Sequence, residues 1–490
     1  MLFTSLSFLL FTGLAVAVYF ALPVRARWAW LLVASWYFYA SWAPSNFVYL
    51  AAVTLAAYGC GWGIARGRSP RRKRLLLLAG LLSVLGILSV FKFWDFLVGE
   101  IESLLGSAGA QPEGAALPRL GVRTPVGLSF YTFSVVTYLV DVYAGRMTAE
   151  AHVGKFGVYV AFFPKIFAGP IERARTFLPQ LGRVVRLEPD RLVSGLQLIL
   201  WGLVKKVVIA DNLAPFVDKG FGNPAYAPPV DLILATYFFA FQIYCDFSGY
   251  TDIAIGVSRV LGFELVENFR RPYLARSPAD FWGRRWHLSL AGWFRDYMYI
   301  PLGGSRVGRL RHYFNIMAVF MVSGLWHAGL GYGVGWTFLV WGALNGLYQW
   351  AGVATAPVWQ RVGRRLPRLG ASPAVHVFRV MLTFHLIAFA WIFFRAGSVP
   401  QALTVIRRIG SSLGTLPRLL PVYPFSWEHY TALALIGLLI GIEIADERRP
   451  MFERLRAAPV PVRWTFYYAA IFALLLVGRW QAREFIYMQF

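Results

Sequence analysis

The sequence predicts an all-α, polytopic integral membrane protein with about 11 transmembrane helices and additional re-entrant or interfacial helices. Of its 490 residues, 58% are hydrophobic and only 15% are charged, and the mean hydropathy is +0.54. A soluble domain carries about 25% charged residues. The apolar residues also gather in stretches of about 20, the length of helix that crosses a ~30 Å hydrocarbon slab. Composition therefore excludes a soluble enzyme and a disordered scaffold.

Basic residues outnumber acidic ones, with 48 Lys and Arg against 24 Asp and Glu, a net charge of +24. Lys and Arg favour the cytoplasmic loops of membrane proteins and the anionic lipid beside them. The charge therefore indicates membrane lipid as a partner and no nucleic acid. The two cysteines, Cys60 and Cys245, are far apart in apolar segments. Their spacing predicts neither a disulfide framework nor a metal site.

The N-terminal segment is predicted to be a first transmembrane span that is not cleaved. Its first 24 residues are uncharged, and Arg25 and Arg27 follow the apolar run. A cleavable signal peptide has the opposite order. We therefore expect residues 2–23 to cross with the N-terminus outside.

The next apolar segments, 28–42 and 46–64, lead to the strongest cytoplasmic marker of the chain, a run with six basic residues between Arg66 and Arg74. The remaining predicted spans are 75–91, 125–143, 153–168, 192–210, 232–262, two within 312–360, 377–394, 430–444 and 464–476. We expect one integral membrane domain over residues 1–490, with a catalytic core over about 120–350.

Strict alternation of sides fails in the middle of the chain. The basic segments near Arg146 and at 173–191 both resemble cytoplasmic loops, although one apolar segment, 153–168, separates them. One segment is therefore expected to be re-entrant, which requires that protein or water cover its backbone.

Polar residues interrupt the predicted span 232–262 at C-D-F-S-G-Y-T-D. Asp246, Ser248 and Asp252 are functional candidates because polar groups at membrane depth are costly. The two carboxylates are six residues apart, about 240° on one helix, so they would not share a face. The competing interpretation is capping and backbone satisfaction at a broken helix.

A second polar cluster combines nine Arg and two Asp between residues 270 and 311 with Trp and Tyr. Arg and aromatic side chains suit the lipid headgroup interface. They would also suit a channel for an anionic thioester donor, because Arg binds phosphate bidentately. His287 lies within this cluster and can titrate near neutral pH. The candidate donor-binding residues here are Arg284, Arg285, Trp286, Arg295, Asp296 and Tyr297.

His327 is the only histidine between residues 313 and 360, a stretch without Asp, Glu, Lys or Arg. A helix from the interface near Arg311 would carry it ~24 Å into the membrane. Gly324, Gly329, Gly331, Gly333 and Gly335 around it permit close backbone approach, as the wall of a tunnel requires. The alternative is a structural role, in which His327 bridges two helices by hydrogen bonds.

A buried neutral imidazole can take the proton from an acceptor hydroxyl that attacks a thioester carbonyl. Nothing in the sequence indicates that the chain supplies its own serine nucleophile, so direct transfer assisted by His327 is the economical mechanism. His287 or Asp296 would orient the base or polarise the carbonyl.

Several motifs together resemble the membrane-bound O-acyltransferase family, in its bacterial alginate O-acetyltransferase branch. They are Y-C-D-F-S-G-Y-T-D-I-A-I-G (244–256), N-F-R-R-P-Y (268–273), F-W-G-R-R-W-H-L-S-L-A-G-W-F-R-D-Y-M-Y-I-P-L-G-G (281–304) and G-L-W-H-A-G (324–329). Supporting pieces are F-F-P-K-I-F-A-G-P-I-E-R (162–173), G-L-V-K-K-V-V-I-A-D-N (202–212) and F-I-Y-M-Q-F (485–490).

The resemblance implies a multi-helix fold around a tunnel, with His327 as the catalytic histidine of the family's W-H-G motif and His287 as a second functional histidine. Two positions depart from the pattern. The motif reads W-H-A here, and Asn345 stands where the branch commonly has a histidine, so a hydrogen bond remains there but no titration.

The implied reaction moves an acetyl group from a cytoplasmic donor, acetyl-CoA as a substrate and no bound cofactor, across the bacterial inner membrane. The implied acceptor is an exported polysaccharide such as alginate, or a periplasmic acetyltransferase partner. Related members move D-alanine to teichoic acid or acetylate peptidoglycan, which leaves another acyl group or acceptor open. A proton-coupled transporter and a structural scaffold are the alternatives from other classes, and the absence of self-similar halves disfavours the transporter.

Overall fold

A computed structural model describes residues 1–42, 44–107, 117–121, 124–328, 335–370, 372–480, 483 and 485–486. Two compact units divide the chain. The first contains Met1–Ile199 and Tyr250–Val266, and the second contains Leu200–Gly249 and Glu267–Ile486. The organisation as a single domain stays a prediction.

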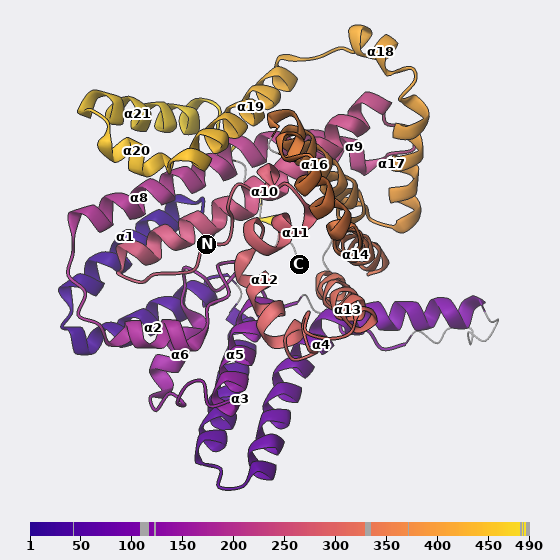
Figure 1. Ribbon diagram of the computed structural model, residues 1–490. Helices are drawn as coiled ribbons and strands as arrows, with labels where there is room; N and C mark the ends of the chain where they lie inside the picture. Colours follow the sequence, from indigo (N-terminus) through magenta and orange to yellow (C-terminus); the bar gives the residue numbers. More distant parts are fainter. Residues whose placement is uncertain are drawn as a thin grey trace. The chain divides into compact units, whose positions relative to one another are not determined.

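Helices and helical turns are the only regular secondary structure over the described ranges, which confirms the all-α prediction. In the first unit, α3, α4 and α5 lie side by side (Figure 1), and α2 packs against α6. The helices of this unit are α1 (Leu6–Ala21), α2 (Val24–Ala40), α3 (Phe47–Arg66), α4 (Pro70–Ser107), α5 (Leu128–Tyr143), α6 (Val153–Ala161), α7 (Ala174–Phe177) and most of α8 (Pro189–Leu203).

In the second unit, α13 packs along α14, and α16 packs on α14. The helix α10 (Pro229–Val260) begins in this unit and ends in the first. The other helices are η3 (Val204–Ala210), α9 (Asp211–Gly222), α11 (Pro278–Asp280), η5 (Phe281–Arg285), α12 (Leu288–Phe294), η6 (Arg295–Tyr299), α13 (Arg309–His327), α14 (Trp336–Arg365), α15 (Pro367–Gly370), α16 (Pro373–Arg395), α17 (Val399–Ser412), α18 (Leu416–Leu419), α19 (Trp427–Arg448), α20 (Met451–Ala457) and α21 (Val460–Leu476).

Within the described part of the chain, six helical stretches are long and apolar enough to cross a membrane. They are Pro44–Arg66, Pro70–Gly106, Pro189–Gly222, Pro229–Val260, Pro373–Arg395 and Trp427–Arg448, and each overlaps a predicted span. Three shorter apolar helices, α1, α5 and α21, overlap predicted spans as well. The chain is therefore a polytopic membrane protein, while the total of about 11 spans stays a prediction.

The predicted span 153–168 is not a membrane-length helix. Its helix, α6, has nine residues, which at 1.5 Å per residue reach only about 14 Å. A helix of this length cannot cross the ~30 Å slab. The re-entrant segment expected between the two basic regions stays a prediction.

The predicted break at C-D-F-S-G-Y-T-D is wrong, because α10 is continuous from Pro229 to Val260. The charge of Asp246 is compensated instead by a partner on another helix. Lys206 Nζ lies 2.6 Å from Asp246 and 2.9 Å from Asp211, and Asp246 also accepts the backbone N–H of Ile486 at 2.7 Å. A buried carboxylate with these partners does not require the helix to open.

Two glycines bring α13 and α14 into close contact. A Cβ at Gly324 would lie 2.5 Å from the carbonyl oxygen of Phe338, and a Cβ at Gly342 would lie 2.5 Å from that of Phe320. Helix backbones approach this closely only where small residues face each other. The contact sets the C-terminal end of α13, with His327, against the first turns of α14.

The buried ion cluster predicts a stability effect. Lys206→Met leaves two buried carboxylates without their cation, and we expect the free energy of unfolding to fall by about 3–5 kcal/mol. Lys219→Met is the control, because its amine also pairs with a buried carboxylate, that of Asp231, but is itself 66% exposed, and we expect it to cost about 1 kcal/mol or less. Thermal unfolding in detergent measures both, and equal losses would contradict the importance of the buried cluster.

Candidate functional site

His327 ends α13, and its imidazole lies in a cage of aromatic side chains. The residue is only 4% exposed. The rings of Trp326 and Trp341 lie 4.5 and 5.2 Å from it, centroid to centroid. Phe394 of α16 lies at 5.2 Å, and Phe338 of α14 stacks at 6.3 Å. The cage draws on three helices and shields the imidazole from water, so a hydrogen bond formed there acts at low dielectric.

Further tryptophans extend this cage behind Trp341. Trp391 of α16 stacks on Trp341 at 5.9 Å, and Trp282 meets it edge-on at 5.5 Å. Trp282 donates its indole N–H to Asn345 Oδ1 at 2.9 Å, and Asn345 donates its amide to the carbonyl of Trp341 at 2.8 Å. Asn345 therefore positions two walls of the cage, and its predicted contact with substrate stays a prediction.

His287 occupies a strained backbone position at the start of α12. Its φ is 44°, in the left-handed region, which costs a non-glycine residue roughly 1–3 kcal/mol. Asn268 holds the turn in place. Its Oδ1 accepts the N–H of Ser289 at 3.1 Å and lies 3.3 Å from His287 Nδ1, and its backbone carbonyl accepts the N–H of Leu288 at 3.0 Å. Such strain at a candidate site favours a functional role for His287.

Aromatic side chains flank the His287 ring. Phe247 of α10 lies 4.8 Å away and Phe269 at 6.4 Å. Burial lowers the pKa of the His287 imidazole to about 3, so the ring is neutral at pH 7. A neutral imidazole can act as a base or as a hydrogen-bond donor.

A chain of ring contacts joins the two histidines within the second unit. Trp286, next to His287 in sequence, packs on Trp391 at 5.2 Å, and Trp391 reaches His327 through Trp341. Trp286 is 2% exposed. As a buried member of this chain, it supports the cage, and its predicted contact with the donor stays a prediction.

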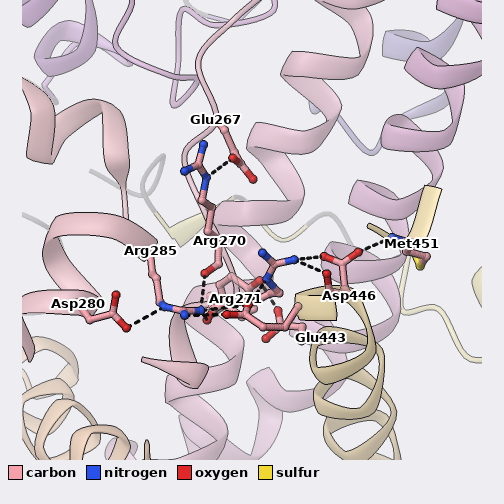
Figure 2. Close-up of polar contacts among 10 residues, drawn as sticks. Glu267, Arg270, Arg271, Asp280, Arg285, Glu443, Asp446 and Met451 are labelled. Carbon is pink, nitrogen blue, oxygen red and sulfur yellow. Dashed lines mark hydrogen bonds and ion pairs between the residues drawn. The ribbon is translucent and has the colours of Figure 1, made fainter. Parts of the chain in front are cut away.

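The Arg-rich loop before His287 is clamped by the acidic end of α19, as Figure 2 shows for Arg271 and Asp446. Arg271 Nη1 lies 2.6 Å from Asp446 Oδ2, and its Nε lies 2.7 Å from Glu447. Arg285 pairs with Asp280 at 3.0 Å (Figure 2) and with Glu447 at 2.9 Å. The backbone N–H of Arg270 also donates to the carbonyl of Arg285 at 2.9 Å. Arg285, predicted to bind the donor, is therefore occupied by two carboxylates.

The other predicted donor-binding residues lie nearer the surface. Arg284 is exposed. Arg295 is also exposed and pairs with Asp296 at 2.8 Å, while Tyr297 contacts the ring of Trp293 at 5.7 Å. Exposed guanidinium groups can meet an anionic ligand without losing a buried partner.

The polar residues of α10 divide by role. Asp246 belongs to the ion cluster with Lys206, Ser248 is buried and Asp252 is half-buried. Phe247 of the same motif contacts the His287 ring, and functional roles for Asp246, Ser248 and Asp252 stay predictions.

The sequence analysis did not identify three residues that position the site: Asn268, Trp341 and Glu447. Asn268 lies in the motif N-F-R-R-P-Y, but its contact with His287 spans 19 residues. Glu447 reaches Arg285 over 162 residues. No local pattern reports such pairs. The predicted glycines Gly329, Gly331 and Gly333 and the C-terminal residues 487–490 lie outside the described residues.

Comparison with known proteins adds independent information. The model of the membrane-bound O-acyltransferase (MBOAT) family matches residues 152–394. A protein of Azotobacter vinelandii named "Probable alginate O-acetylase AlgI" is 36% identical over 408 residues, covering 82% of this chain and 76% of the relative. The peptidoglycan O-acetyltransferase of Helicobacter pylori is 32% identical over 404 residues, 77% of this chain and 72% of its own. The teichoic acid D-alanyltransferase of Bacillus subtilis is 26% identical over 279 residues, 55% of this chain and 68% of its own.

The acidic clamp predicts a change in local dynamics. Glu447→Gln weakens the pairs to Arg271 and Arg285, each worth about 0.2–1 kcal/mol when partly exposed. A combined loss near 1 kcal/mol would speed amide exchange in residues 268–289 about fivefold. Hydrogen–deuterium exchange of peptides from this loop measures it. Glu428→Gln, at the opposite end of α19 and paired with Arg479, should leave the loop unchanged, and equal exchange in both variants would contradict the clamp.

Proposed function

The chain belongs to the membrane-bound O-acyltransferase family, and from that membership we propose that it transfers an acetyl group from acetyl-CoA to an exported polysaccharide, with His327 as the catalytic base. The observation that carries the proposal is the enclosed position of His327. That the chain is a multi-pass membrane O-acyltransferase follows from the family and from its apolar helices.

The acyl group and the acceptor are proposed from the relatives. Proteins at 32–36% identity carry names for O-acetylation, of alginate or of peptidoglycan. The D-alanyltransferases match a smaller part of this chain, 55%, at 25–26% identity. The comparison favours acetyl over D-alanyl and a glycan as acceptor, with alginate the first glycan to test.

His327 acts by proton transfer in the proposed mechanism. The acceptor hydroxyl attacks the thioester carbonyl carbon and gives its proton to the imidazole, and the carbonyl electron pair moves to oxygen. Collapse of this intermediate expels the CoA thiolate, which takes the proton back from the imidazole. The aromatic cage supports these steps because it excludes water, which would otherwise compete as an acceptor.

His287 has a supporting role in this proposal. Its ring is neutral and its Nδ1 faces the acceptor Asn268 Oδ1, so Nδ1 carries the proton and Nε2 can accept a hydrogen bond from the acceptor hydroxyl without a change of charge. Arg284 and Arg295 supply exposed positive charge for the phosphates of the donor.

The direction of transfer is inferred from charge. The basic run 66–74 marks a cytoplasmic loop, and acetyl-CoA is a cytoplasmic donor. We therefore place the chain in the bacterial inner membrane, where it passes acetyl groups outward to the glycan or to a periplasmic acetyltransferase.

Radiolabelled acetyl-CoA tests the proposal in membranes that contain the intact chain and its partner proteins. Label should appear in cell-surface polysaccharide, and His327→Ala should lower the rate about 10²–10⁴-fold, the usual contribution of a general base. His376→Ala, on an exposed position of α16, is the matched control and should transfer at the unsubstituted rate.

Two outcomes would overturn the proposal. If His327→Ala transfers normally, His327 is not the base. If the intact chain transfers nothing from acetyl-CoA but accepts an acyl-carrier protein as donor, the assignment of the donor is wrong.

A further inference from the structure

Two buried indole N–H groups, of Trp341 against His327 and of Trp391 behind it, lack a hydrogen-bond acceptor among the described residues. Across the residues that the structure describes, neither Trp341 Nε1 nor Trp391 Nε1 has a partner. Both side chains are almost fully enclosed, at 2% and 1% exposure. Their rings stack on each other with an interplanar angle of 17°. Two donors without acceptors therefore lie in one layer of the cage.

Such groups are costly and uncommon in a folded protein. A buried donor without an acceptor loses about 1–3 kcal/mol of hydration that nothing replaces, and most buried polar groups are paired. The third tryptophan of this layer, Trp282, meets that requirement, since its N–H is bonded to Asn345. The chain thus satisfies one indole of the cluster from its own side chains and leaves the two others open.

Tryptophan is not required merely to fill these positions. Phe338 and Phe394 form other walls of the same cage and carry no donor. A phenyl ring at 341 or 391 would avoid the cost of the orphan N–H. An acceptor that arrives with the substrate explains why the indoles are present, because it repays the cost only during the reaction.

We propose that the indole N–H groups of Trp341 and Trp391 donate hydrogen bonds to the carbonyl oxygen of the transferring acyl group. Trp341 contacts the His327 ring at 5.2 Å, and Trp391 stacks on Trp341 at 5.9 Å, so both indoles lie near the atoms that react in the proposed function, on which this inference rests. The acceptor oxygen bonds to the carbonyl carbon, and its proton passes to His327. Negative charge then develops on the carbonyl oxygen of the acyl group. Donors already in place stabilise the charge more than they stabilise the neutral carbonyl.

An isosteric substitution isolates the N–H. Trp341→3-benzothienylalanine and Trp391→3-benzothienylalanine keep the fused ring and replace the N–H by sulfur. We expect kcat for acetyl transfer from acetyl-CoA to fall about 100-fold, as for loss of one oxyanion donor, with KM changed less than twofold. The thermal unfolding midpoint should stay or rise, because no protein hydrogen bond is lost.

Trp282→3-benzothienylalanine is the matched control. It removes the bond to Asn345, so its unfolding midpoint should fall. The proposal is overturned if both variants at 341 and 391 retain kcat within threefold, or if their unfolding midpoints fall as that of the control does. Failure of the proposed function gives a different pattern: the unsubstituted protein is then inactive with acetyl-CoA, or His327→Ala remains active.

Discussion

The close approach of α13 and α14 at Gly324 and Gly342 is the constraint on which the candidate site depends. Each glycine lies where a Cβ would meet a carbonyl oxygen of the other helix at 2.5 Å. Without a side chain at either position, the end of α13 can rest on the first turns of α14. The ring of Trp341, one residue before Gly342, then lies against His327. Backbone contact, rather than a polar bond, therefore builds the cage around the imidazole.

Charge compensation follows a consistent division across the second unit. The buried cation Lys206 is bonded to two carboxylates, and Arg271 and Arg285 of the Arg-rich loop are bonded to the acidic end of α19. The pairs of Arg271 and Arg285 hold the loop that precedes the strained turn at His287. Arg284 and Arg295 are exposed, so in the proposed function they are the arginines that meet the anionic donor. The Arg-rich cluster at 270–311 therefore contains more arginines than can bind a donor. Arg271 and Arg285 would first have to lose a carboxylate partner.

The sequence predicted the all-helical membrane fold because a helix that crosses the hydrocarbon slab needs about 20 consecutive apolar residues, and such stretches are visible in the sequence. It also singled out His287 and His327, since histidine is rare among apolar residues. It could not find Asn268, Trp341 or Glu447. Their roles come from contacts between segments that are distant in the sequence. Asn, Trp and Glu also occur at many positions of a membrane protein without a functional role, so the residue type alone does not mark them. The broken helix at Asp246 was predicted wrongly for the same reason, because the compensating Lys206 lies 40 residues away.

If the packing of α13 on α14 creates the environment in which His327 acts in the proposed function, a single methyl group at this interface should abolish transfer. Gly342→Ala would press a Cβ against the carbonyl oxygen of Phe320, whereas Gly352→Ala, on the same helix, has no atom within 4 Å to meet. The measurement is the acetyl transfer rate of the two variants at matched amounts of folded protein. The account predicts loss of transfer in Gly342→Ala, with His327 unchanged, and full transfer in Gly352→Ala. Equal rates in both variants would contradict it.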